Sequence, residues 1–396
     1  MPPAPARQPG ITEPQQPHAL LVSYDLTPGT RGAAGRDAVR RLLARWTELL
    51  AGAGAGLGAG AGAGAGAGPG PGPGPGPGPG AGPGAGTGPG PGAGAGAGTG
   101  AGAGAGAGPG AGPGLTVTVG IGPALPPRLG AGAPEGLREL PAFPGEYLDA
   151  GAGGGEIAVQ ICAQDPGECE RMAALLAGAG AGVLRPRWRQ PGFLPPQRPG
   201  PQSSLFTSVR DGETPRDLLG FKNGTSNPTP VESERWVWLG GQNPYADGTF
   251  LVVRRVRLRT EEFGRLPVFR QEQIIGRRKN GGEPLGGGTE YDEADLHAKS
   301  PDGADVLPAD AHVRLAHPRL DDGARMLRRG YSYANSPLDR GLLFLAYLKD
   351  PALFVRVQER LSAGDALNPF AEHYGSALFY VLPGARPGFP LGSTVL

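Results

Sequence analysis

The chain has 396 residues, and its 37 lysines and arginines nearly balance its 36 aspartates and glutamates, for a net charge of +1. A charge this close to zero gives no general attraction to nucleic acid or to an anionic membrane. No apolar run approaches the ~20 residues that a membrane-spanning helix requires. The two cysteines, Cys162 and Cys169, are too few for a disulfide scaffold and lack the spacing of a zinc motif.

The segment 51–114 consists almost wholly of Gly, Ala and Pro. It has no side chains to bury and cannot offset the entropy cost of its own ordering, so we expect a disordered insert. The rest of the chain is long enough for two ordinary domains. The first residues carry neither a secretory nor a twin-arginine signal. As written, the protein is expected in the cytoplasm, or outside the cell if its true N-terminus is missing.

The first half of the chain, apart from this insert, alternates strand and helix patterns. β-Branched and apolar runs predict strands, and apolar residues at helical spacing predict helices. In chain order these are a strand at 18–26, a helix at 38–50, strands at 115–122 and 155–164, a helix at 167–180 and a strand or extended segment at 182–193. This β-α-β-β-α-β order is that of a ferredoxin-like domain.

The second half repeats the theme. The patterns predict a strand at 248–259, a helix with a Pro interruption at 260–276, strands at 324–334 and 340–350, a helix at 351–364 and a strand at 376–384. We therefore expect α+β architecture with antiparallel sheets and peripheral helices. The expected parts are a flexible N-terminus (1–14), an N-terminal domain (15–200) interrupted by the insert, and a C-terminal domain (201–396).

Two segments carry candidate chemistry. "DAHVRLAHPR" (310–319) holds His312 and His317 close to arginines, which suits a site that ligates a metal and neutralises anionic groups. The alternative is that both histidines are solvated or satisfied in the core. "MLRRGYSY" places Arg328 and Arg329 before an aromatic strand, and successive strand residues point to opposite faces. One arginine can then face a pocket, although both can equally be solvated.

Taken together, these motifs resemble those of the dye-decolorising peroxidases. "GFKNGTSNP", "AHVRLAHPR", "MLRRGYSY" and "GLLFLAYLKD" occur in the order and spacing of that family, and most resemble its bacterial deferrochelatase/peroxidase branch. The resemblance covers the chain except the Gly/Ala/Pro insert. It implies two ferredoxin-like domains of the dimeric α+β barrel type and one haem b per chain, held mainly by the C-terminal domain.

The resemblance also implies roles for individual residues. His312 matches the axial iron ligand, while His317 occupies a less consistent position that we treat as structural. Arg314 matches an arginine that faces a haem propionate, a role that suits a fixed guanidinium. The distal arginine maps to Arg328, with Arg329 as the alternative. The apolar wall on the peroxide side and further cofactor contacts map to Leu343, Phe344, Gly224 and Thr225.

One position departs from the family pattern. The family signature is GxxDG, whose Asp shuttles a proton, but residues 220–224 read Gly-Phe-Lys-Asn-Gly. Asn223 can orient peroxide by hydrogen bonding but cannot take up a proton near neutral pH. We therefore expect intact haem binding and a slowed reaction with peroxide.

The resemblance thus implies a peroxidase that uses hydrogen peroxide and oxidises dye-like or phenolic reductants in one-electron steps. The alternative is a haem-handling protein, including deferrochelatase-like iron release, with weak peroxidase activity. Neither nucleic acid nor a membrane is expected as a partner, and family members often form homo-oligomers. Surface aromatics would relay electrons from large reductants, and the available candidates are Trp188, Trp236, Trp238, Tyr331 and Tyr333.

Overall fold

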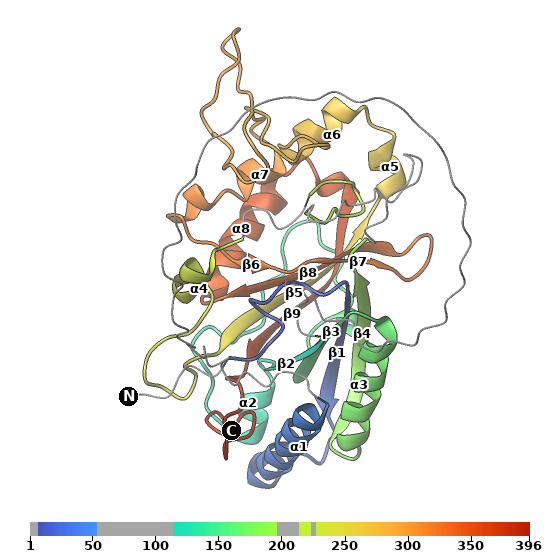
Figure 1. Cartoon of the computed structure of the whole chain (residues 1–396), viewed down its shortest axis with the longest axis vertical. Coiled ribbons are helices and arrows are strands. Elements are labelled where there is room, and N and C mark those ends of the chain that lie inside the picture. Colours follow the sequence, from blue (N-terminus) through green and yellow to red (C-terminus); the bar gives the residue numbers. More distant parts are fainter. Residues whose placement is uncertain (1–6, 54–113, 196–213, 223–226) are drawn as a thin grey trace, which may run out of the picture. The chain divides into compact units, whose positions relative to one another are not determined.

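The computed structural model describes residues 7–53, 114–195, 214–222 and 227–396. Within these ranges the chain forms a nine-stranded antiparallel sheet with helices packed outside it (Figure 1). Apart from its ends, the Gly/Ala/Pro insert lies outside the described residues. No helix in the described ranges combines the length and apolarity that crossing a membrane would require.

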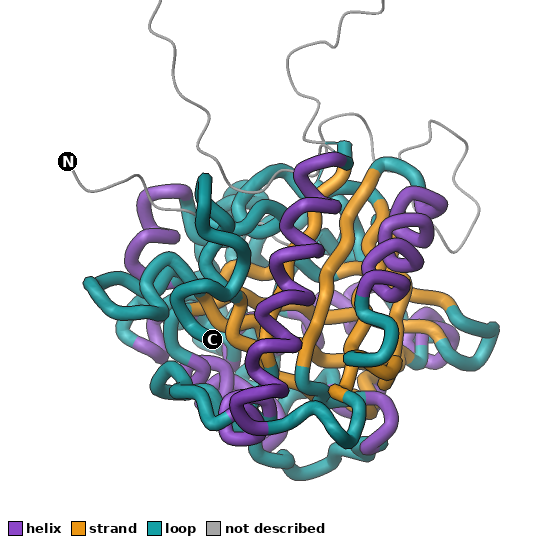
Figure 2. Tube along the Cα trace, turned by 90° about the horizontal axis from the view of Figure 1, so that it is seen from below, coloured by secondary structure: helices purple, strands orange, loops and turns teal. Residues whose placement is uncertain are grey.

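The N-terminal half has the expected ferredoxin-like arrangement. Its strands pair antiparallel in the order β2-β3-β1-β4, and helices lie along one side of them (Figure 2). The α3 helix begins after Asp165, whose side chain accepts a hydrogen bond from Gly167 N, and Pro166 fills the first turn. The elements are β1 (His18–Leu26), α1 (Gly32–Gly52), β2 (Leu115–Ile121), α2 (Leu125–Leu129), η1 (Ala150–Ala152), β3 (Ile157–Ala163), α3 (Pro166–Ala179) and β4 (Leu184–Phe193).

The C-terminal half repeats this strand order as β7-β8-β5-β9, with the short β6 also paired to β8. The predicted helix 260–276 is divided in two around Pro267, as its proline indicates. The elements are α4 (Pro230–Trp236), β5 (Thr249–Leu258), α5 (Thr260–Gly264), α6 (Val268–Ile275), α7 (His312–Leu315), η2 (Pro318–Asp321), β6 (Leu327–Arg328), β7 (Tyr331–Ala334), β8 (Arg340–Leu348), α8 (Pro351–Gly364), η3 (Asn368–Phe370) and β9 (Ala371–Val381).

The two halves share one sheet. Pairing of β2 with β9 and of β4 with β7 joins them, and pairing of β5 with β8 closes the ring of strands. Both faces of β1 are therefore buried: Leu20 and Val22 pack in the core under the helices, whereas Ala19 and Leu21 pack in a second core shared by both halves. This arrangement confirms the predicted α+β class with two ferredoxin-like repeats.

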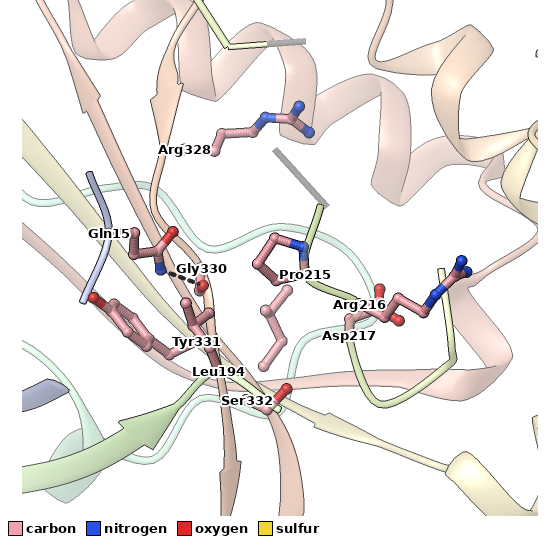
Figure 3. Close-up of a pocket in the computed structure, with 10 residues that line it drawn as sticks. Gln15, Leu194, Pro215, Arg216, Asp217, Arg328, Gly330, Tyr331 and Ser332 are labelled. Carbon is pink, nitrogen blue, oxygen red and sulfur yellow. Dashed lines mark hydrogen bonds between the residues drawn. The ribbon is translucent and has the colours of Figure 1, made fainter. Parts of the chain in front are cut away.

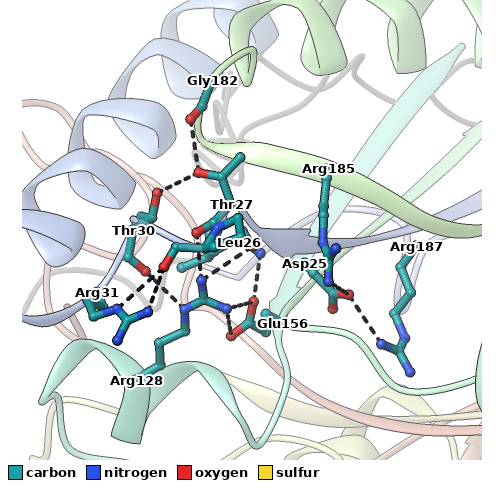
Figure 4. A network of polar contacts seen from close by, with 11 residues as sticks. Asp25, Leu26, Thr27, Thr30, Arg31, Arg128, Glu156, Gly182, Arg185 and Arg187 are labelled. Atoms are coloured by element: carbon teal, nitrogen blue, oxygen red, sulfur yellow. Dashed lines mark hydrogen bonds and ion pairs between the residues drawn. The ribbon is translucent and has the colours of Figure 1, made fainter.

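A buried ion pair fastens the connection between β1 and α1 (Figure 4). Arg128 of α2 donates to both carboxylate oxygens of Glu156, at 3.0 and 2.9 Å, and to the carbonyls of Thr27 and Thr30. Glu156 in turn accepts from Leu26 N at 2.6 Å. Because Arg128 NH1 reaches both carboxylate oxygens while its other nitrogens donate to backbone carbonyls, these charge-assisted bonds hold the ends of β1 and α2 together.

The segment before β1 is part of the core, which differs from the expected flexible N-terminus over residues 7–14. Ile11 is fully buried, and the Gln8 amide donates to the carbonyls of Val119 and Leu382. Gln160 donates to Gly10 O. These bonds satisfy buried backbone groups of β2 and of the residue after β9, so the segment is held in place by hydrogen bonds that composition does not reveal.

Candidate functional site

His312 opens α7, a single helical turn packed against α8. Its Nδ1 lies 2.6 Å from Oδ2 of Asp365, the residue that ends α8. The other carboxylate oxygen of Asp365 accepts from Leu367 N at 2.8 Å, which fixes the carboxylate. Burial acts to lower the pKa of His312, but the Asp365 carboxylate outweighs it and raises that pKa above its ordinary value. With Asp365 as acceptor, Nδ1 carries the proton and Nε2 presents a lone pair.

The imidazole of His312 borders open space. Its side chain keeps 34% of its surface accessible, whereas the Asp365 side chain keeps only 3%. Within the described ranges Nε2 has no hydrogen-bond partner. A neutral imidazole held by a carboxylate and open at its far nitrogen has the arrangement of a metal-ligating histidine.

Arg328 lies at the end of β6, with its backbone clamped by one side chain. Asn227 accepts from Arg328 N at 2.9 Å and donates to Arg328 O at 2.8 Å. The guanidinium itself forms no hydrogen bond or ion pair with any residue that the structure describes. Burial, with help from Arg277 and Arg325, lowers the pKa of Arg328 to about 10, so the group stays cationic at neutral pH.

Arg328 borders a cavity of about 40 Å³ (Figure 3). A cavity of this volume has room for only a few water-sized molecules. Its lining includes Gln15, Leu194, Asp217, Arg328, Tyr331 and Leu342. The cavity therefore combines a cation, a carboxyl group and apolar walls in a space that suits a very small polar molecule.

Arg329 points the other way. Arg329 is 5% exposed, and its guanidinium donates to the carbonyls of Ile11 and Glu13 in the segment before β1. The two arginines thus take opposite faces, as strand geometry predicts for neighbours, although β6 ends at Arg328. Arg328 is the one at the cavity, and Arg329 is a structural anchor.

The apolar residues of β8 divide between its two faces. Leu343 is fully buried in the core that contains Tyr331 and is not among the residues that line the cavity. Leu342 lines the cavity instead, and Phe344 packs against Phe354 of α8, with ring centroids 6.2 Å apart. Of the two wall residues expected from the sequence, the structure therefore places Phe344, but not Leu343, on the α8 side of the sheet.

The remaining predicted residues have these positions. Arg314 donates from NH1 to Leu307 O at 2.9 Å. His317 is buried and accepts from Arg319 N at 3.2 Å, so it caps the 3-10 turn η2, in keeping with a structural role. The predicted residues of the 220–224 turn and its flank, Asn223, Gly224 and Thr225, lie outside the described residues.

Three residues of the site were missed by sequence reasoning. Asp365 lies 53 positions from His312, and its only signal is its place directly after the helix-ending Gly364. Asn227 belongs to the motif "GFKNGTSNP", but nothing in the letters indicates that it clamps Arg328. Asp217 precedes that motif by three residues, and only the structure places it at the cavity.

Comparisons with known proteins find the same family in both halves of the chain. Family profiles described as "Dyp-type peroxidase, N-terminal" and "Dyp-type peroxidase, C-terminal" match residues 8–194 and 214–386. A dye-decolorizing peroxidase of Thermobifida fusca is 37% identical over 284 residues, 66% of this chain and 62% of the relative. A deferrochelatase of Yersinia pseudotuberculosis is 38% identical over 263 residues, 63% of this chain and 58% of the relative. The aligned part thus spans about three fifths of these curated relatives.

Solved structures cover more of the chain. DtpA from Streptomyces lividans is 31% identical, with a TM-score of 0.74 and coverage of 99% of this chain and 96% of DtpA. A DyP-type peroxidase from Streptomyces coelicolor is 32% identical, with a TM-score of 0.74 and coverage of 98% and 94%. DypB from Rhodococcus jostii, a heme complex at 19% identity and a TM-score of 0.63, shares the fold.

Proposed function

The chain belongs to the Dyp-type peroxidase family, and we propose that it uses one haem b per chain to reduce hydrogen peroxide. A small dye-like or phenolic reductant would supply the electrons one at a time. Proteins of this family are haem proteins. The observation that carries the proposal is the pair of groups just described: a carboxylate-held His312 with an open nitrogen, and a cationic Arg328 at a small cavity.

The residues present fit a haem group. Iron in haem is commonly held by one neutral imidazole, and the neutral tautomer of His312 that donates from Nδ1 to Asp365 leaves Nε2 open. The hydrogen bond from Nδ1 to Asp365 fixes the ring orientation and makes Nε2 a stronger donor to metal. Arg314 is the proposed partner of a propionate, with Phe344, Gly224 and Thr225 as further contacts to the ring.

When bound, the haem supplies the iron that binds peroxide and the electrons that break its O–O bond. The protein then has three tasks. His312 holds the group from one side, and Asp365 keeps the imidazole in the required tautomer. Arg328, clamped by Asn227 and free of other partners in the described ranges, stabilises the negative charge that develops on the departing oxygen.

Stopped-flow mixing of the purified holoprotein with hydrogen peroxide tests this function. We expect a change of the Soret absorbance that depends on peroxide concentration, followed by return of the original spectrum when a phenolic reductant is added. Asn223→Asp, which restores a proton-accepting group, should accelerate the first step by at least ~10-fold. A wild-type protein that binds haem tightly but shows neither change would overturn the peroxidase assignment.

A second candidate is haem handling, including release of iron from haem. It is favoured by the amide at position 223 and by relatives named deferrochelatase. Incubation of the holoprotein with and without peroxide, followed by porphyrin fluorescence, distinguishes the two. Fluorescent metal-free porphyrin that accumulates without peroxide supports haem handling, and its absence beside rapid peroxide turnover supports the peroxidase.

A further inference from the structure

Asp217 shares the 40 Å³ cavity with Arg328 but belongs to a different part of the chain. It lies in the described segment 214–222, at a turn closed by a hydrogen bond from Gly220 N to Asp217 O. Figure 3 shows its carboxylate and the Arg328 guanidinium among the groups around the cavity, while the Arg216 guanidinium extends away. Arg216 donates instead to backbone carbonyls of Lys279 and Asn280.

Of the two carboxylate oxygens of Asp217, Oδ1 accepts the hydrogen bonds that the fold supplies. Oδ1 accepts from Leu219 N at 2.9 Å and from Phe221 N at 3.2 Å, which fixes the turn. Over the described ranges no hydrogen bond reaches Oδ2, and no ion pair joins Asp217 to a cation. One oxygen thus orients the group and the other is left for a molecule in the cavity.

The surroundings shift the pKa of this carboxyl upward. Burial raises the pKa of Asp217, and the hydrogen bonds from Phe221 and Leu219 oppose this shift without cancelling it. The titratable groups in its electrostatic environment are His312 and Lys279, and Arg328 lines the same cavity. A carboxyl whose pKa moves towards neutral is a better proton carrier than an ordinary surface aspartate.

The other polar groups of the cavity lack this ability. Arg328 stays cationic at neutral pH. Burial raises the pKa of Tyr331 well above its usual value, and its hydroxyl contacts Cys162 Sγ at 3.5 Å. Gln15 and Ser332 do not titrate. Among the described lining residues, Asp217 is therefore the carboxyl group, with its pKa shifted upward, that can accept and return a proton.

We propose that Asp217 is the proton-exchanging residue of this cavity and takes over the proton transfer that Asn223 cannot perform. The inference rests on the proposed peroxidase function. Asp217 accepts the proton of one peroxide oxygen and delivers it to the other, which leaves as water while the O–O bond breaks. A bound haem group would supply the two electrons that reduce the departing oxygen, and Asp217 returns to its starting state.

The test is the rate of cyanide binding to the ferric holoprotein, measured against pH. Hydrogen cyanide must lose a proton to bind iron, so its binding reports a nearby base without requiring turnover. Asp217→Asn keeps an oxygen acceptor for the amides of Leu219 and Phe221 but cannot exchange a proton. We expect cyanide binding at least ~10-fold slower in this variant, with loss of the wild-type fall in rate towards low pH.

Two further variants make the result decisive. Asp217→Glu should retain a pH-dependent rate of cyanide binding. This variant tests the proposal even if Asp217→Asn fails to fold. Asp165→Asn, in a similar turn where Oδ1 accepts from Gly167 N at 2.8 Å, should behave as wild type. An unchanged rate and pH profile in Asp217→Asn overturns the proposal. Failure of peroxide turnover in a wild type whose cyanide binding still depends on Asp217 would reject the peroxidase function alone.

Discussion

Nδ1 of His312 lies 2.6 Å from Oδ2 of Asp365, so a short hydrogen bond ties a one-turn helix to the end of α8. A helix of four residues has little stability of its own, because helix formation needs several turns to repay its nucleation. The position of the imidazole therefore depends on this bond and on packing against α8. Asp365 is buried and held by Leu367 N, so it is a rigid partner.

Removal of this carboxylate should weaken cofactor binding. We expect Asp365→Asn to lower haem affinity by roughly 10–100-fold, because an outer partner that orients a ligating histidine commonly contributes this much. Titration of the apoprotein with haem, followed at the Soret band, measures the effect. Asp350→Asn, which alters the cap at the other end of α8, is the matched control and should keep wild-type affinity. Equal affinities in all three proteins would show that Asp365 does not support the ligand.

The arginine pair gives a second prediction. Arg328→Leu should slow the reaction with peroxide by about 10²–10³-fold, because it removes a preorganised positive charge, while haem affinity stays close to wild type. Arg329→Leu should instead lower the melting temperature, since Arg329 anchors the segment before β1 through Ile11 O and Glu13 O. Stopped-flow rates and thermal unfolding of both variants separate these effects. The assignment of the two roles fails if the arginines exchange phenotypes.

Sequence reasoning reached the elements of this fold because periodicity and turn residues are local signals. The ferredoxin-like order was readable from six segments in each half, and the break near Pro267 followed from one residue. Closure of the ring through β2–β9 and β4–β7 was not readable, since each contact has only one or two residue pairs and no compositional mark.

The site residues likewise include some that local sequence signals predicted and some that depend on long-range packing. Opposite faces for Arg328 and Arg329 followed from strand geometry, and His312 from a motif. Asp365 was missed because its contact with His312 is created only when α7 packs on α8. Leu343 was expected in the apolar wall on the peroxide side; the register of β8 places it in a core, whereas Leu342 lines the cavity. A shift of one residue in strand register exchanges the side chains that face the core with those that face the cavity, and a motif match does not determine the register.

A glycine next to α7 gives a third prediction. Gly276 ends α6 with φ of +92°, and a Cβ there would meet Val313 Cγ2 and lie 2.8 Å from Leu307 Cδ1. We expect Gly276→Ala to destabilise the protein by ~1–3 kcal/mol through overpacking and to displace α7 with its histidine. Denaturant unfolding and haem titration measure the two consequences. Gly264→Ala, where a Cβ meets nothing within 4 Å, is the control. Wild-type stability and affinity in Gly276→Ala would mean that α7 tolerates the shift.

The last prediction concerns pH and the carboxylate that fastens η2 to α8. The side chain of Asp321 is 2% exposed, and it accepts from Arg356 Nε at 2.9 Å and from Arg360 NH2 at 2.5 Å. Burial acts to raise the pKa of Asp321, but the two arginines outweigh it and the net shift is downward. The stabilisation is therefore fully present above the unfolded-state pKa of about 3.9 and is lost as pH falls through the folded-state value.

At pH 7, Asp321→Asn should lower the free energy of unfolding by about 2 kcal/mol, a typical contribution of hydrogen bonds to a charged group. The difference from wild type should shrink as pH falls below about 4, where the unfolded chain takes up the proton, and level off below the lowered folded-state pKa, where Asp321 is neutral in both states. Asp322→Asn changes an exposed neighbour with no ion pair among the described residues, and should match wild type at every pH. A difference between wild type and Asp321→Asn that stays constant down to pH 2 would mean that packing, and not charge, accounts for the contribution of Asp321.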